Sequence, residues 1–95
     1  MARGLERTFL VELYVPQLDE QAAVAISSRC RAAVGELAEQ GVALRWVRSF
    51  VLLDEETYLC VVATRDRDHV IQLSRRAGLE HDHVAEVVAI DGRPS

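Results

Sequence analysis

The sequence predicts an α+β fold in which one antiparallel four-stranded sheet carries two helices on a single face. Three observations lead to this prediction. Apolar and polar residues alternate in four segments, at the period of a β-strand. In two other segments apolar residues recur every three or four positions, the spacing of an amphipathic helix. The acidic break Asp54-Glu55-Glu56 separates two neighbouring β-rich runs, the pattern of a hairpin.

The first half of the chain predicts one strand and one long helix. The strand covers residues 8–15, and Pro16 ends it because proline has no N–H to donate to a ladder. Asp19 is suited to cap the helix, which runs to about Gln40. Its apolar stripe contains Ala22, Ala23, Ile26, Cys30, Ala33, Val34 and Leu37.

The second half predicts a hairpin, a shorter helix and a last strand. The hairpin strands cover residues 43–53 and 57–64. Asp66 can cap a helix that runs to about Ala77, and the last strand covers residues 84–90. The order strand, helix, strand, strand, helix, strand is that of the ferredoxin-like βαββαβ sandwich.

Length and composition predict a single domain over residues 1–95, with an ordered core at about residues 8–90. Hydrophobic residues make up 49% and charged residues 27%, as in an ordinary globular protein. The formal net charge of −4 gives no electrostatic footprint for nucleic acid or for an anionic membrane. No apolar run reaches the length of a membrane span, which is about 20 residues.

The N-terminus lacks the apolar core and cleavage site of a signal peptide, which favours a cytoplasmic location. In a reducing compartment Cys30 and Cys60 are expected to be free thiols. Their separation has no C-x-x-C spacing, so they do not form a zinc or thioredoxin motif.

The sheet face without helices is the first candidate site. Strand alternation places Phe9, Val11 and Leu13 toward the helices, and Val47, Ser49 and Val51 with them. The side chains expected on the open face are Glu12, Tyr14, Trp46, Arg48, Phe50 and Cys60. The residues of the third strand fit either face. So apolar a face is typical of a dimer interface or a ligand groove.

Charged groups on that face need partners, because an unpaired buried charge is costly. A Glu12–Arg48 ion pair across the sheet is the structural interpretation of these two residues. The functional interpretation is a polar spot in a small pocket. Cys60 would gain reactivity if Arg48 lay beside it and lowered the thiol pKa.

His81 and His83 form the second candidate site. In an extended stretch both imidazoles of an H-x-H pair point to the same side and can bind a divalent metal. A solvated turn explains the same residues without a ligand. No phosphate-binding loop, zinc-protease motif or serine-hydrolase motif is found, and no catalytic residue is assigned.

Three segments, VELYVPQLDEQAA, GVALRWVRSFVLLDEETYLCVVA and AGLEHDHVAEV, resemble a small bacterial family of uncharacterised function. Its described member is a ferredoxin-like, dimeric nickel-binding protein. The resemblance covers about residues 9–88. The residues that carry it are Glu12, Trp46, Ser49, Thr57, Cys60, Ala77, Gly78, Leu79 and Asp82.

The resemblance implies a homodimer that binds a divalent metal such as nickel. Many family members carry a histidine where this chain has Arg48, and a protonated guanidinium cannot ligate a metal. His81 and His83 have no counterpart in the family, so they would be a local substitute.

Three functions therefore stay open. The first is a non-catalytic homodimer, joined through the open face, that binds a small ligand or nickel-type metal. The second is a small dimeric α+β barrel enzyme, such as an isomerase or an oxygenase. There Glu12 would be the base, beside Tyr14, and Arg48 would bind an anionic substrate. The third is a regulatory partner domain.

Overall fold

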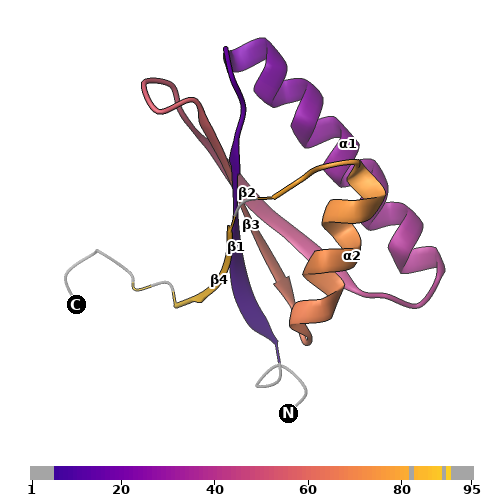
Figure 1. The fold of residues 1–95 in the computed structure, drawn as a ribbon. Helices are drawn as coiled ribbons and strands as arrows, with labels where there is room; N and C mark the ends of the chain where they lie inside the picture. Colours follow the sequence, from indigo (N-terminus) through magenta and orange to yellow (C-terminus); the bar gives the residue numbers. More distant parts are fainter. Residues whose placement is uncertain (1–5, 82, 89, 91–95) are drawn as a thin grey trace.

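The computed structural model describes residues 6–81, 83–88 and 90, and Figure 1 shows their arrangement. The elements are β1 (Arg7–Tyr14), α1 (Glu20–Glu39), β2 (Leu44–Leu52), β3 (Thr57–Thr64), α2 (Arg67–Ala77) and β4 (His83–Val87). This order confirms the predicted ferredoxin-like fold. Each bound lies within a few residues of its prediction, and β4 ends earlier than expected. Asp82 lies outside the described residues.

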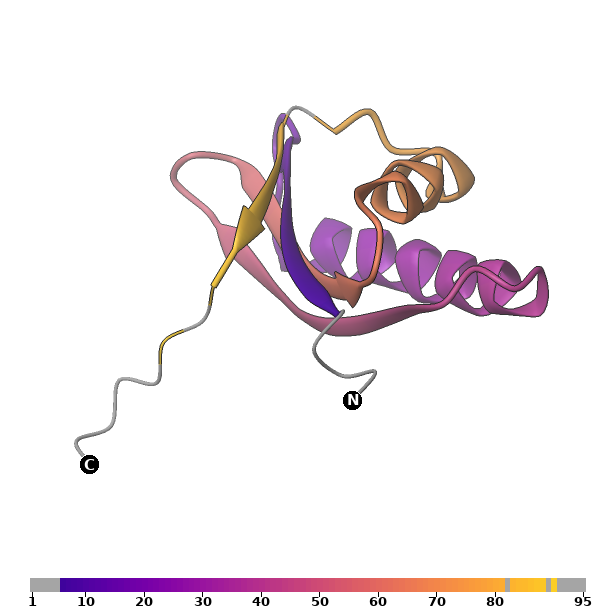
Figure 2. The ribbon, with the colours of Figure 1, turned by 90° about the horizontal axis from the view of Figure 1, so that it is seen from below.

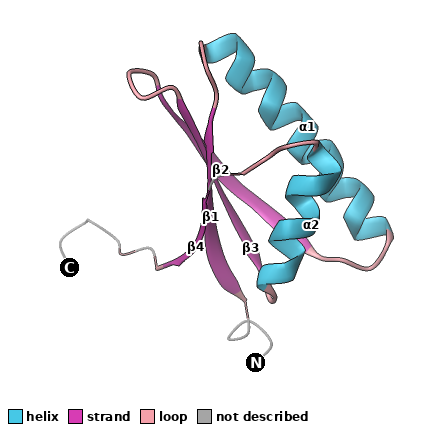
Figure 3. Cartoon of the chain, viewed as in Figure 1, coloured by secondary structure: helices cyan, strands magenta, loops and turns pink. Residues whose placement is uncertain are grey.

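The four strands form one antiparallel sheet in the order β2-β3-β1-β4. Both helices lie on the same side of this sheet, and the other side carries no helix (Figures 1 and 3). The view from below shows the two layers separately, with β4 at one edge of the sheet (Figure 2). Neither helix of the described residues is long and apolar enough to span a membrane.

The core lies between the sheet and the helices. Phe9, Val11 and Leu13 of β1 face it, as predicted, and each is less than 8% exposed. From the helices, the buried residues are Ala23, Ile26, Cys30, Ala33, Leu37, Val70, Leu73 and Ala77. Burying these apolar side chains supplies the main free energy of folding.

Polar caps set the ends of both helices. The carboxylate of Asp19 accepts a hydrogen bond from the backbone N–H of Ala22 at 2.8 Å, and Asp66 caps α2 in the same way. Gly78 ends α2 in the left-handed conformation, with φ of 74°. Leu79 N–H then donates to the Ser74 carbonyl at 2.9 Å, so the chain reverses without leaving that carbonyl unpaired.

A β-bulge interrupts the alternation of β2. Trp46 pairs with Val62 of β3 and Arg48 pairs with Val61, which leaves Val47 as an extra residue. Trp46 therefore shares the helix-covered face with Val62 and packs against the core, so its predicted place on the open face was wrong. Val47, predicted to face the helices, is 44% exposed. The prediction failed because it assumed an unbroken period of two.

The burial of its side chains shows which residues of β3 face the helices. Tyr58, Cys60 and Val62 face the helices, and none is more than 2% exposed. Leu59 and Val61 alternate with them and are only partly buried. The prediction that Cys60 lies on the open face was therefore wrong.

Candidate functional site

The open face of the sheet carries four of the six side chains predicted there. Glu12 and Tyr14 lie on β1, and Arg48 and Phe50 lie on β2. Phe50 is 46% exposed and Tyr14 56% exposed, and Leu52 extends the same surface at the end of β2. A single chain thus leaves a band of apolar side chains uncovered on this face.

Glu12 and Arg48 do not form the expected ion pair. Glu12 pairs with Leu59, whereas Arg48 pairs with Val61, so β3 lies between them and they are offset along it. Within residues 6–81 and 83–88, the salt bridges join Arg7 to Glu86, Arg45 to Glu6 and Arg76 to Glu36. Two of the three side chains of the predicted enzyme site, Glu12 and Arg48, are therefore not cross-strand neighbours.

Tyr14 is tied to the hairpin turn instead. Its hydroxyl donates to the Glu56 carboxylate at 3.1 Å, and this carboxylate also accepts from the Gln17 N–H at 2.6 Å. The hydrogen bond to Glu56, together with its negative charge, raises the pKa of Tyr14. The Val15 N–H donates to the Glu56 carbonyl at 2.8 Å, so one residue joins the hairpin turn to the end of β1.

The sheet register brings Glu12 and His83 together. They are directly opposite each other on β1 and β4, which places their Cβ atoms about 4.5–5.5 Å apart on the open face. Sequence reasoning had assigned one to a pocket and the other to a metal site. It could not relate them, because only the pairing of β1 with β4 does so.

His81 lies just before β4, and its Nδ1 is buried without a hydrogen-bond partner among the described residues. A buried imidazole nitrogen that lacks a partner is uncommon, and neutral imidazole is a common metal ligand. In the described part of the chain, no group of three or more histidine, cysteine, aspartate or glutamate side chains is placed to hold a metal ion.

Cys30 and Cys60 meet in the core, on α1 and β3 respectively. Both are free thiols, with 1% and 2% exposure, and their side chains are hydrogen-bonded to each other. The hydrogen bond to Cys30 and burial both raise the pKa of Cys60. Arg48 lies on the other face of the sheet, so the predicted activation of Cys60 by this cation was wrong.

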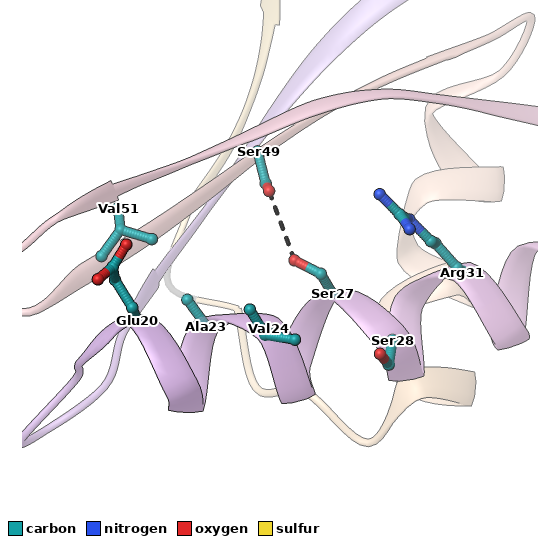
Figure 4. Close-up of a pocket in the computed structure, with 8 residues that line it drawn as sticks. All are labelled: Glu20, Ala23, Val24, Ser27, Ser28, Arg31, Ser49 and Val51. Atoms are coloured by element: carbon teal, nitrogen blue, oxygen red, sulfur yellow. Dashed lines mark hydrogen bonds between the residues drawn. The ribbon is translucent and has the colours of Figure 1, made fainter.

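A cleft of about 380 Å³ lies on the helix side, between α1 and β2. Its lining residues are Glu20, Ala23, Val24, Ser27, Ser28, Arg31, Ser49 and Val51, drawn in Figure 4. Sequence reasoning placed Ser49 on the helix side but did not recognise a cleft. The other residues that line it come from a separate element, and no motif connects the two.

Hydroxyl groups occupy the inner wall of this cleft. Ser27 Oγ lies 2.7 Å from the Tyr58 hydroxyl and 3.4 Å from Ser49 Oγ. Tyr58 is 1% exposed, and burial raises its pKa, although hydrogen bonds with Ser27 and Ser49 oppose the shift. Buried polar clusters of this kind are stable only when every member is paired.

Comparisons with known proteins place the whole domain in one family. Residues 9–87 match the model of a family described as "Nickel responsive protein SCO4226-like". The crystal structure of SCO4226 from Streptomyces coelicolor A3(2) is similar, with a TM-score of 0.72. Its sequence is 14% identical, and the match covers 88% of this chain and 99% of that one. At this identity the likeness supports the fold alone. Among curated proteins, none matches.

Proposed function

Because the chain belongs to the SCO4226-like family of nickel responsive proteins, we propose that it binds a nickel-type divalent ion on the open face of its sheet. The observation that carries the proposal is the direct pairing of Glu12 with His83 across β1 and β4. Imidazole nitrogen and carboxylate oxygen are donors that Ni²⁺ accepts. His81 precedes His83 by two residues and is the third candidate donor, because its Nδ1 has no hydrogen-bond partner among the described residues.

The described residues of one chain bring no three candidate ligands together, so a second copy is proposed to supply the rest. The uncovered apolar band around Phe50 and Leu52 is the surface that a second copy would bury. A twofold interface uses the same patch on both copies. Each copy would therefore bring its own Glu12 and His83 to the shared interface.

The metal part of the proposal is tested by isothermal titration calorimetry with NiCl₂. Glu12→Gln and His83→Asn should each weaken nickel binding by about tenfold or more, because loss of one of few ligands is not compensated. Glu86→Gln is the matched control, since this exposed residue lies on the same strand but on the other face. Equal affinities in all four proteins, or no heat with the wild type, would exclude the site.

The dimer part is tested separately by sedimentation equilibrium. The wild type should sediment as a dimer, and Phe50→Asp should sediment as a monomer because it places a charge in the proposed interface. Val24→Asp is the control, because Val24 is also an exposed apolar residue, at 66% against 46% for Phe50, but lies on α1, away from the open face. A wild type that stays monomeric across the concentration range contradicts the proposed interface.

A further inference from the structure

The cleft between α1 and β2 lies on the opposite side of the sheet from the proposed nickel site. We propose that it binds a small organic anion that is charged at one end only, whose carboxylate or phosphate head group contacts Arg31 and the serine hydroxyls and whose short apolar body lies against Ala23, Val24 and Val51. This proposal does not depend on metal binding or on dimerisation.

The polar groups of the cleft are unusual for their position. Ser27 and Ser49 face each other across the interface between a helix and a sheet, where apolar side chains normally interlock. Their 3.4 Å separation is long for a hydrogen bond between hydroxyls, which favours about 2.8 Å. Ser49 also lies within hydrogen-bonding reach of Tyr58, but a hydroxyl has one donor and two acceptor lone pairs, so Ser49 keeps bonding capacity for a ligand. The short bond between Ser27 and Tyr58 holds Ser27 in place.

Arg31 supplies the charge. It follows Ser27 by one helical turn, and Figure 4 shows its side chain directed toward the strand side of the cleft. Arg31 makes no hydrogen bond or ion pair with the described residues, unlike Arg45 and Arg76. The guanidinium of Arg31 can therefore donate all its hydrogen bonds to a ligand. Together with the nearby serine hydroxyls, it suits the binding of a carboxylate or phosphate.

A carboxylate at the other end of the cleft limits where a ligand can carry negative charge. Glu20 lies there, beside Val51, in the first turn of α1 (Figure 4). Arg31 follows Glu20 by eleven positions, a rise of about 16 Å along the helix. A ligand with negative charge at both ends would meet this carboxylate, so the cleft favours anions charged at one end over anions charged at both ends. Ala23 and Val24, together with Val51 near Glu20, offer a surface for an apolar body.

The proposal is tested by titrating the ¹⁵N-labelled protein with sodium hexanoate and hexyl phosphate, recording amide chemical shifts. Saturable changes are expected on α1 and β2. Hexanamide, which keeps the body without the charge, should bind about tenfold more weakly or worse, as is typical for loss of a charged hydrogen bond. Adipate, with a carboxylate at both ends, should also bind more weakly than hexanoate. Whichever of the two anions binds more tightly identifies the head group.

Two arginine variants distinguish specific binding in the cleft from nonspecific binding to the helix surface. Arg31→Gln should weaken binding of the preferred anion about tenfold or more, and Arg29→Gln, on the exposed side of α1, should leave it unchanged. Both residues are exposed, so neither change threatens folding. Equal affinity for hexanoate and hexanamide, equal effects of the two variants, or no saturable shift with either anion would overturn the proposal. Loss of nickel binding alone would not affect it.

Discussion

The hydroxyl cluster beneath the α1–β2 cleft allows a quantitative prediction about Tyr58. Its ring is 1% exposed, and its hydroxyl bonds to Ser27 at 2.7 Å, with Ser49 also within hydrogen-bonding reach. In the wild type, Tyr58→Phe removes a satisfied buried hydrogen bond. This should lower the free energy of unfolding by about 1 kcal/mol.

Tyr58→Phe should have the opposite effect on the free energy of unfolding when both serines are absent. In Ser27→Ala/Ser49→Ala, the Tyr58 hydroxyl stays buried without either partner, which costs about 1–3 kcal/mol. Adding Tyr58→Phe removes the unsatisfied group and should recover about 1 kcal/mol or more. For a domain of this length, 1 kcal/mol corresponds to a shift in Tm of about 4–8 °C.

The assay is urea denaturation of the four proteins, followed by circular dichroism at constant protein concentration. Reversal of the sign of Tyr58→Phe between the two backgrounds is the expected result. If Tyr58→Phe destabilises both backgrounds equally, the hydroxyl has a partner other than the serines, such as water entering from the cleft. The reasoning about a closed hydroxyl cluster would then be refuted.

The same variant has a defined pH dependence. Burial raises the pKa of Tyr58 above its ordinary value of 10.0, which is also the value expected for the unfolded chain. The stability contributed by the neutral hydroxyl is therefore fully present below pH 10.0 and is lost as the pH rises through the folded-state pKa. The free energy of unfolding should fall more steeply above pH 10.0 in the wild type than in Tyr58→Phe. Equal slopes would contradict this.

Three further predictions test the framework of the domain. Deleting Val47 should preserve the fold, because it removes the extra residue of the bulge and leaves Trp46 directed to the core. The fluorescence emission maximum of Trp46, the single tryptophan, should therefore stay unchanged. A red shift of this maximum would contradict the bulge assignment. Asp19→Ala should cost about 1 kcal/mol in urea denaturation, whereas Asp54→Ala in the hairpin turn should not. Cys30 and Cys60 should react with Ellman's reagent only after denaturation, and rapid reaction in the native state would disprove their burial.

The sequence predicted the fold well because each element has a strong local signal. The caps Asp19 and Asp66 and the inward alternation of β1 are examples, and the structure confirms all of them. The side chains of β2 were harder to place, because a bulge at Val47 changes the face of every residue before it. No local pattern marks this position, since valine suits a strand on either face.

The candidate sites depend on contacts that no local pattern records. The pair Glu12–His83 exists because β1 lies between β3 and β4, and the cleft exists because Ser27 meets Ser49 across two elements. Cys60 was placed on the wrong face because β3 is apolar on both sides, so the alternation of residues does not show which side chains face the helices. The contact between Cys60 and Cys30 of α1 shows that this side chain faces the helices.

The central position of β1 also has a consequence for the order in which the domain folds. The hairpin of β2 and β3 closes through a short turn, but β1 must pair with β3 across the whole of α1 and β2. Closing that loop costs chain entropy before any contact offsets it. The rate-limiting step should therefore be the insertion of β1 beside a hairpin that has already formed. The five-residue β4, which pairs with β1 alone, should join only after the transition state.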